Sequence, residues 1–398
     1  MSVDVIGIGA DGIGGLRPEV RALLDAAEVI VGGERHLGFV GDHGATKIPW
    51  RRPLEATFED LEPHLDRRIV VLSSGDPLDH GVARRLFERF GSERVAVHPH
   101  PSAFALACAR LGWSRDEVTC LSLHARPLAR LKRELVPGRR LLLLTDAKTS
   151  ASAIAAALRE TGWGPSRVWR LSRLGAPDEI LAEGIARDWS DPTITELDTV
   201  AVACVPDPTA PPIVGFTLAD DAFLHDGQLS KAQARMHALF ALHPLPGQHL
   251  WDVGAGAGGI AITWLRAAGE GQVTAIETDY ERAALLQKNA DRLGTPEVQV
   301  CIADAPEVYD ELDDPDVVFV GGGCHDPAVL EGAWERLPAG GRLVAQAVTC
   351  EGQTVLSAMA EKLGGTLTRF HRETKAPLGG KSTWRPSLPV LQLEAVKP

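Results

Sequence analysis

The sequence predicts an α/β fold made of two domains, and three observations support this prediction. Short apolar runs bounded by glycine and turn residues alternate with helical stretches along most of the 398 residues, which is typical of sheets covered by helices. A proline-rich stretch interrupts this alternation near the middle of the chain. Each half also carries a glycine-rich loop directly after an apolar strand. We therefore expect domains at residues 1–205 and 215–398, joined by a linker at residues 206–214.

The expected linker is defined by four prolines within seven residues, Pro206, Pro208, Pro211 and Pro212. Proline fixes φ and has no N–H to donate, so this stretch is neither a helix nor a central strand. A chain of this length also favours two or three domains over one.

In the first half, apolar runs that alternate with helical patterns predict an α/β domain with much parallel sheet. The predicted strands are residues 3–9, 28–31, 69–73, 95–98, 118–121, 141–145, 168–171 and 199–204. The clearest helical stretches are residues 81–90, 103–110 and 150–160.

In the second half the alternation is more regular, but the tail differs. Helices are predicted at residues 231–242, 259–268 and 280–293, and strands at residues 250–253, 273–277, 298–302, 317–320 and 342–347. The tail has two further strand-like runs, residues 366–372 and 389–396, with no helix between them. Strands joined without a crossover pair antiparallel, so we expect a mostly parallel sheet that ends in an antiparallel hairpin.

Composition narrows the class of protein. A net charge of −12 argues against a nucleic-acid partner, although a few arginines can still form a pocket for a small anion. The six cysteines form no CxxC pair and no zinc-like spacing, so we expect reduced thiols and no metal site. The first residues lack a signal-peptide pattern, and the longest apolar runs are too short to span a bilayer. We therefore expect a cytoplasmic protein without a membrane partner.

Two glycine-rich loops are the main candidates for ligand binding. The first reads Gly7-Ile-Gly9-Ala-Asp-Gly12, and the second reads Gly254-Ala-Gly256-Ala-Gly258-Gly259 and leads into a helix. Glycine allows a sharp turn and a close approach of the backbone to a ligand. The free N–H groups at a helix start can meet polar or anionic ligand groups.

Acidic residues after the following strands support the second loop. Glu277 ends the next strand, where a carboxylate can accept both hydroxyls of a ribose. Asp304 follows the third strand and could accept from an adenine amino group; its alternative interpretation is a helix N-cap ahead of Pro306. This pattern fits NAD as well as the nucleoside of S-adenosylmethionine.

Three features favour the methyl donor over NAD. A predicted helix precedes the glycine strand within its own domain, and the sheet is expected to close with an antiparallel hairpin. In addition, Asp252 lies two residues before Gly254, where its carboxylate suits a cationic sulfonium.

The C-terminal half resembles the class I, Rossmann-like methyltransferases that act on precorrins in cobalamin synthesis. The resemblance is carried by residues 220–235, Leu250-Trp-Asp-Val-Gly-Ala-Gly256, Ala275-Ile-Glu277, residues 315–323 with the triple glycine Gly321–Gly323, and residues 340–349. The N-terminal half resembles the class III, tetrapyrrole-type methylases, which are two-lobed α/β proteins. That resemblance is carried by residues 5–12, Ser73-Ser-Gly75-Asp76-Pro77, Pro101-Ser102, residues 118–126 and residues 143–147.

The two resemblances imply S-adenosylmethionine as the methyl donor of both halves. In the first half the implied donor site comprises Gly7, Gly9, Gly75, Asp76, Pro77 and Ser102. In the second half it comprises Asp252, Gly254, Gly256, Gly258, Glu277, Asp304 and Gly321. The implied reaction is methyl transfer to carbon 5 by the first half, and methyl transfer to carbon 15 with decarboxylation of the carbon-12 acetate by the second. The implied partner is a small tetrapyrrole, and we expect a homo-oligomer.

Such a substrate carries carboxylates, so cations near the site are candidates for binding it. Lys231 and Arg235 lie four residues apart on one predicted helix face, and Lys381 and Arg385 are expected to close the site from the tail. His124 and His225 are candidate proton carriers. Each of these has an alternative interpretation as an ordinary surface or satisfied side chain.

Three other functions remain open at this point. The first is a methyltransferase that acts on RNA or protein, and the second is an NAD-dependent dehydrogenase. The third is a tetrapyrrole carrier with one inactive half, because Ala10 replaces a usual proline and His80 a usual tyrosine in the first half.

Overall fold

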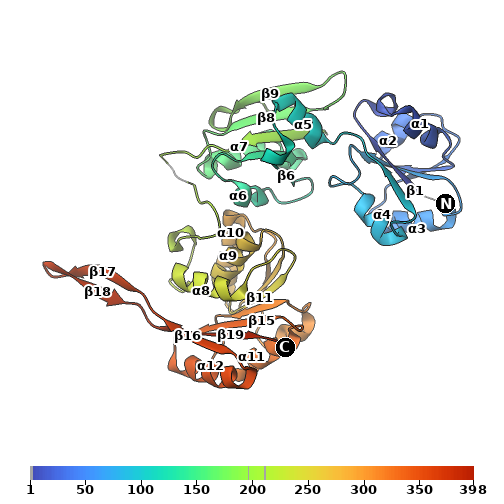
Figure 1. Ribbon diagram of the computed structural model, residues 1–398. Helices are drawn as coiled ribbons and strands as arrows, with labels where there is room; N and C mark the ends of the chain where they lie inside the picture. The colour runs from blue at the N-terminus through green and yellow to red at the C-terminus, as the bar shows by residue number, and fades with distance from the viewer. Residues whose placement is uncertain (1–2, 196, 210–211) are drawn as a thin grey trace. The chain divides into compact units, whose positions relative to one another are not determined.

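The computed structural model describes residues 3–195, 197–209 and 212–398 (Figure 1). The chain divides into two compact units. Unit 1 comprises residues 1–128 and 137–212, and unit 2 comprises residues 129–136, with the short helix α6 (Leu131–Glu134), and residues 213–398. The predicted linker at residues 206–214 stays a prediction, because Pro211 lies outside the described residues.

The first lobe of unit 1 is a five-stranded sheet in the order β3-β2-β4-β1-β5, and all its pairs are parallel. Helices α3 and α4 pack against one apolar face of this sheet, and α1 and α2 pack against the other. The strands are β1 (Val3–Ile8), β2 (Val29–Gly32), β3 (Thr46–Pro49), β4 (Ile69–Ser74) and β5 (Val95–His98), and the helices are α1 (Pro18–Asp25), α2 (Glu34–Val40), α3 (Glu55–Leu61) and α4 (Ala83–Phe90). The parallel sheet predicted for this half is confirmed here.

The second lobe of unit 1 has the order β6-β7-β10-β8-β9, and only its β6–β7 pair is parallel. The expectation of much parallel sheet therefore holds for the first lobe and is wrong for the second. The strands are β6 (Val118–Ser122), β7 (Arg140–Leu144), β8 (Arg167–Ser172), β9 (Ile180–Ile185) and β10 (Asp198–Ala203), with helices α5 (Ala103–Leu111) and α7 (Ala151–Glu160).

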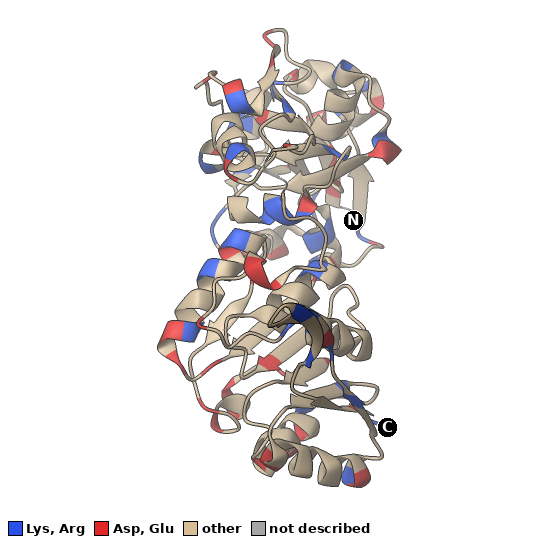
Figure 2. Cartoon of the chain, turned by 90° about the vertical axis from the view of Figure 1, so that its left-hand side faces the viewer, with Lys and Arg blue, Asp and Glu red and all other residues tan. Residues whose placement is uncertain are grey.

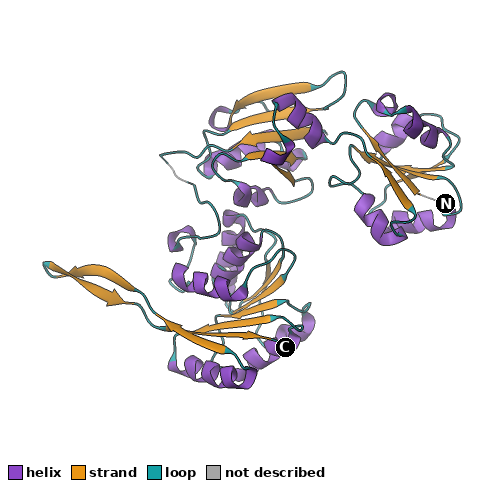
Figure 3. Ribbon diagram, viewed as in Figure 1, coloured by secondary structure: helices purple, strands orange, loops and turns teal. Residues whose placement is uncertain are grey.

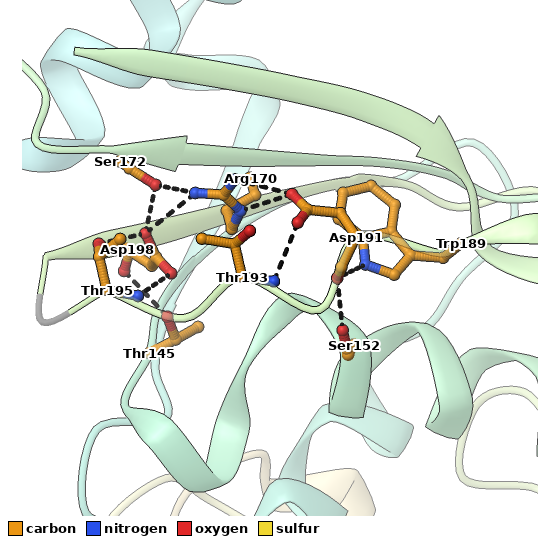
Figure 4. A network of polar contacts seen from close by, with 9 residues as sticks. All are labelled: Thr145, Ser152, Arg170, Ser172, Trp189, Asp191, Thr193, Thr195 and Asp198. Atoms are coloured by element: carbon orange, nitrogen blue, oxygen red, sulfur yellow. Dashed lines mark hydrogen bonds and ion pairs between the residues drawn. The ribbon is translucent and has the colours of Figure 1, made fainter. Parts of the chain in front are cut away.

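A buried polar network stabilises one end of this second sheet (Figure 4). Arg170 on β8 pairs with Asp191 at 2.7 Å and lies 3.8 Å from Asp198 at the start of β10. The hydroxyl of Thr145, next after β7, donates to the Asp198 carbonyl at 2.9 Å. Buried charges are costly unless they are paired, so these contacts are needed to keep Arg170 and Asp198 in the interior. They also connect β8 and the end of β7 to the segment between β9 and β10.

Unit 2 contains a seven-stranded sheet in the order β13-β12-β11-β14-β15-β19-β16 (Figure 3). Helices α8, α9 and α10 contribute to the apolar core on one face, and α11 and α12 to the core on the other. The strands are β11 (His249–Val253), β12 (Gln272–Ile276), β13 (Gln299–Cys301), β14 (Val317–Val320), β15 (Arg342–Ala347), β16 (Thr366–Phe370) and β19 (Val390–Val396). The helices are α8 (Ala232–Leu242), α9 (Gly259–Ala268), α10 (Tyr280–Leu293), α11 (Pro327–Arg336) and α12 (Cys350–Leu363).

The predicted end of the sheet is confirmed: β19 is antiparallel to both β15 and β16, whereas the other pairs are parallel. Between β16 and β19 the chain forms an additional hairpin, β17 (Glu373–Leu378) and β18 (Lys381–Pro386), which extends away from the rest of unit 2 (Figure 1). The hairpin is mostly exposed and makes a sheet of its own.

Basic and acidic positions are interspersed along the chain in the view of Figure 2. Among the described residues, none of the helices is both long and apolar enough to cross a membrane.

Candidate functional site

A cavity of about 1120 Å³ lies in unit 2 at the carboxyl ends of its parallel strands. Its wall includes the glycine loop after β11, the residues that follow β12, β13 and β14, the start of α8 and the base of the β17–β18 hairpin. In open parallel sheets, ligands bind in the crevice outside the carboxyl ends of the strands. The cavity is therefore the candidate donor and acceptor site of unit 2.

Two glycine segments meet main chain to main chain at this site. Gly254 has φ +69°, and a β-carbon there would lie 2.4 Å from the backbone N of Gly322. Gly256 also has a positive φ, of +56°. No larger residue fits at Gly254, so the loop after β11 and the loop after β14 can approach only as bare backbone. Gly321, from the predicted triple glycine, lines the same cavity.

Glu277 orders the glycine loop. It is 6% exposed, and its Oε2 accepts the backbone N–H of Gly256 at 2.7 Å while Oε1 accepts that of Asp279 at 3.0 Å. Each carboxylate oxygen retains a lone pair. Glu277 is therefore a buried, well-ordered carboxylate rather than a solvent-exposed charge, and its role in binding a ribose stays a prediction.

Asp252 is almost completely buried beside this loop, and its Oδ2 accepts the Ala261 N–H at 2.8 Å. Burial raises the pKa of Asp252 to about 7, and the negative charge of Glu277 adds to the shift, although the Ala261 hydrogen bond opposes it. A cationic ligand in the cavity would favour the ionised form of this carboxyl group.

The two remaining predicted donor residues of unit 2, Asp304 and Gly258, differ in their position relative to the cavity. Asp304 is exposed and lines the cavity; its N-cap alternative is wrong, because the 3-10 helix at Glu307–Glu311 has Pro306 at its cap position. Gly258 does not line the cavity, which corrects its predicted donor contact: it has φ +85°, a β-carbon there would lie 2.8 Å from Leu286, and as the N-cap of α9 it allows the helix to begin directly after the loop. The predicted residues that line the cavity fit S-adenosylmethionine, since a glycine cradle and three carboxylates suit a cationic nucleoside.

Of the two cations predicted at α8, one lines the cavity and the other does not. Lys231, at the N-cap of α8, lines the cavity. Arg235 is 0% exposed, pairs with Asp220 at 2.9 Å and donates to the carbonyls of Leu218 and Ser230. The expectation that Arg235 binds substrate is therefore wrong. Its guanidinium is bound by Asp220 and by two backbone carbonyls, and it does not line the cavity.

The predicted tail cations are not at the cavity either. Lys381 and Arg385 lie on β18, outside the residues that line it. The base of the same hairpin contributes Arg372 instead, which sequence reasoning missed. The signal was present, since Arg372 ends the predicted strand 366–372. His225 is outside the lining residues, with its Nδ1 2.9 Å from the Gly227 N.

In unit 1 the predicted donor residues converge at the ends of β1, β4 and β5. A β-carbon at Gly7 would lie 2.1 Å from the Gly75 carbonyl oxygen, and one at Gly9 would lie 2.6 Å from the His100 ring. Gly75 has φ +56°, and a β-carbon there would lie 3.1 Å from the Ser102 Cα. The three segments thus meet largely through backbone, with the side chains of Asp11 and His100 packed beside Gly9.

The polar residues of these loops shape the backbone. The Asp76 carboxylate accepts the Leu78 N–H at 2.9 Å, the Pro77 carbonyl accepts the Ala83 N–H at 3.2 Å, and the Ser102 hydroxyl caps α5 by accepting the Ala105 N–H at 3.3 Å. The predicted donor site of unit 1 is consequently formed mainly by backbone groups, with Asp11 and His100 beside Gly9.

A second cavity, of about 780 Å³, lies in unit 1 and is lined partly by arginines of α4 and by His80, His124 and Arg126. The predicted proton carrier His124 is therefore in a pocket, on the loop after β6. Asp146 holds this loop, because its Oδ2 accepts the N–H of Ala125, which has φ +55°, at 2.7 Å. The hydrogen bond from the Ala125 N–H is the main reason that the pKa of Asp146 is lowered to about 2.

The fold and the two glycine cradles define a methyltransferase that uses S-adenosylmethionine. Unit 1 has the two-lobed α/β fold expected for a class III methylase. Unit 2 has the fold expected for a class I methyltransferase, a parallel sheet that ends in antiparallel strands. Residues 3–188 match the family of tetrapyrrole (corrin/porphyrin) methylases, and residues 221–397 match the precorrin methyltransferase domain.

The full chain is similar to precorrin-6Y C(5,15)-methyltransferase [decarboxylating] of Mycobacterium tuberculosis, with 40% identity over 99% of each chain. It is 38% identical to the Sinorhizobium protein of the same name, over 98% of this chain and 94% of that one. The crystal structure of the C-terminal domain of the Rhodobacter capsulatus precorrin-6Y C5,15-methyltransferase is similar to 46% of this chain and 97% of its own, with 36% identity and a TM-score of 0.43. The chain belongs to the precorrin-6Y C(5,15)-methyltransferase (decarboxylating) family.

Proposed function

We propose that this chain methylates precorrin-6Y at carbons 5 and 15 and decarboxylates the carbon-12 acetate, giving precorrin-8 in cobalamin biosynthesis. The observation that carries the proposal is that each compact unit has its own cradle of glycine loops for a methyl donor. Two cradles match two methyl transfers. We assign carbon 5 to unit 1, and carbon 15 with the decarboxylation to unit 2.

The chemistry requires alignment more than side-chain catalysis. A meso carbon conjugated to ring nitrogens is enamine-like and nucleophilic, and the donor sulfonium is electrophilic. The protein therefore needs to hold carbon, methyl group and sulfur in line and to exclude water. The backbone contacts at Gly7 and Gly254 supply rigid walls for this purpose.

Decarboxylation leaves an electron pair that the conjugated macrocycle can take up. The leaving carboxylate must be desolvated, while the other carboxylates of the substrate are bound. His124 and His225 stay predictions as proton carriers. Of these two, only His124 is among the lining residues of the described cavities.

Product mass tests the proposal directly. The purified chain is incubated without oxygen with precorrin-6Y and S-adenosylmethionine carrying a deuterated methyl group. We expect two labelled methyl gains and one loss of carbon dioxide. Methylation of RNA or protein without conversion of the tetrapyrrole would contradict the proposal, and one methyl gain alone would indicate an inactive unit.

We also propose a homo-oligomer in the cytoplasm. The β17–β18 hairpin exposes Leu378 and Trp384 to 60% and 64%, and an isolated two-stranded ribbon is marginally stable in water. A second copy of the chain is the partner we expect on it. Within the part of the chain that the structure describes, the six cysteines form no disulfide, which suits a reducing compartment. Sedimentation of the chain with and without Trp384→Ser tests the oligomer, and an unchanged mass would contradict this role of the hairpin.

A further inference from the structure

The charges that line the unit 2 cavity are divided between two groups of elements. Asp252, Glu277, Asp304 and Asp326 come from β11 and the residues after β12, β13 and β14, where the donor cradle lies. Arg282 of α10 also lines the cavity, but its charge is paired with Asp226. Lys231 and Arg372 come from the start of α8 and the base of the hairpin. A cavity with carboxylates on the donor elements and cations on the others suits a cationic donor and an anionic acceptor.

Lys231 and Arg372 differ from the other cations near this cavity. Arg282 pairs with Asp226 at 2.9 Å, and Arg235 pairs with Asp220. Within residues 3–195, 197–209 and 212–398, the side chains of Lys231 and Arg372 have neither an ion pair nor a hydrogen bond with the protein. Their charges are available to a ligand.

The backbone at both residues is fixed by hydrogen bonds and packing within unit 2. The N–H of Arg372 donates to the Ser387 hydroxyl at 2.9 Å, and the Ser387 N–H donates to the Arg372 carbonyl at 2.6 Å, which closes the base of the hairpin. Two residues earlier, Phe370 stacks on His237 of α8, with ring centroids 3.9 Å apart. The middle of α8, the helix that has Lys231 as its N-cap, is thus packed against β16, the strand that leads to Arg372.

Helix α8 is also fixed to the sheet. Gln346 on β15 donates from its Nε2 to the Ala234 carbonyl at 2.9 Å and to Gln392 of β19 at 2.8 Å. Both glutamines are buried. The backbone positions of Lys231 and Arg372 are therefore set by the packed core of unit 2, which reduces the entropy lost when they bind a ligand.

We propose that Arg372 and Lys231 bind the peripheral carboxylates that the tetrapyrrole retains, and that they determine the affinity of unit 2 for its acceptor. This inference rests on the proposed function. A cation paired with the leaving carboxylate would stabilise it and oppose loss of carbon dioxide. The pair therefore binds the remaining carboxylates, and acts on KM more than on kcat.

The test compares residues of one hairpin. Arg372→Met removes a cavity cation, whereas Arg385→Met removes a cation on β18 that does not line the cavity. Arg372→Lys restores the charge, and Lys231→Met tests the second cation. Each full-length variant is assayed with precorrin-6Y for carbon-15 methylation and carbon dioxide release, and for carbon-5 methylation. Calorimetry with S-adenosylhomocysteine reports whether the donor site is intact.

We expect Arg372→Met and Lys231→Met to raise KM for both reactions of unit 2 by about 10-fold or more, since charge-assisted hydrogen bonds are lost. Arg372→Lys should recover part of the loss, and carbon-5 methylation and S-adenosylhomocysteine affinity should not change. If Arg372→Met matches Arg385→Met, or if it lowers kcat alone, the inference is overturned. If wild-type chain does not convert precorrin-6Y at all, the proposed function itself has failed.

Discussion

The donor cradles of the two units exclude side chains in the same way but are ordered differently. In unit 1, a β-carbon at Gly7 would meet the Gly75 carbonyl at 2.1 Å, and in unit 2 one at Gly254 would meet Gly322 at 2.4 Å. Unit 2 adds a buried carboxylate, Glu277, which accepts the N–H of Gly256 from its loop. Unit 1 orders its three loops by backbone contacts and short local caps. Close backbone packing is thus common to both predicted donor sites, whereas ordering by a buried carboxylate distinguishes unit 2.

The largest effect should follow from Gly254→Ala. Its β-carbon would overlap the backbone of Gly322, and its φ of +69° is unfavourable for alanine. We expect unit 2 methylation to fall by at least about 100-fold, with carbon-5 methylation unchanged, as measured by product mass. Gly380→Ala, which meets no atom within 4 Å, is the control. Retained carbon-15 methylation would contradict the backbone contact.

Gly7→Ala is the corresponding change in unit 1. The added methyl group would collide with the Gly75 carbonyl oxygen, so we expect loss of carbon-5 methylation by about 100-fold while unit 2 stays active. Gly14→Ala in the same region has free space around its β-carbon and should be neutral. Loss of both methylations in Gly7→Ala would show that the units are not independent.

Glu277→Ala tests the charge that distinguishes the two cradles. Removing the carboxylate leaves the Gly256 N–H and the ribose hydroxyls without an acceptor, and we expect donor affinity in unit 2 to weaken by about 1–3 kcal/mol. Calorimetry with S-adenosylhomocysteine on the full chain should show one of two binding events weakened. Two unchanged events would remove Glu277 from the site.

Asp146→Asn tests the loop that carries His124 in unit 1. Asparagine keeps an oxygen for the N–H groups of Lys148 and Thr149, but its amide NH₂ would face the Ala125 N–H, donor against donor. We expect carbon-5 methylation to fall about 10-fold, measured as kcat/KM. Thr149→Val removes the reciprocal capping bond to Asp146 N but leaves the Ala125 contact, so it should have the smaller effect. The reverse order would argue against a role of the loop.

The smallest effect concerns pH. Burial raises the pKa of Asp252 to about 7 in the folded chain, above its unfolded value of about 4. The folded state therefore binds this proton more tightly, and donor-free unit 2 should lose stability as pH rises from about 4 to 7. Asp252→Asn should remove this loss and raise Tm at pH 8, by about 2–4 °C for each kcal/mol regained. An equal pH dependence of Tm in both chains would contradict the burial argument.

The sequence predicts one cradle better than the other for a physical reason. In unit 2 Asp252 lies near the end of one strand, the loop follows it directly and Glu277 follows the next strand at short spacing, so the pattern alone identifies them. In unit 1, Gly7, Gly75 and Ser102 are far apart in the chain. They could be grouped only through resemblance, because backbone contacts leave little trace in composition.

Other elements escaped prediction for local reasons. Strand β3, Thr46–Pro49, is short and largely exposed, so it lacks a buried apolar pattern. The β17–β18 hairpin is polar, yet its Gly379-Gly380 turn is a recognised hairpin signal. The burial of Arg235 depends on Asp220 and on the carbonyls of Leu218 and Ser230, and helix periodicity does not show such contacts.

The contact between Gly254 and Gly322 limits how this enzyme can evolve. A collision between two side chains can be relieved by shrinking either one, but here both surfaces are peptide backbone. No second substitution nearby can make room. Changes in acceptor preference must therefore come from substitutions at the rim of the cavity, because the glycine cradle cannot be reshaped by single substitutions.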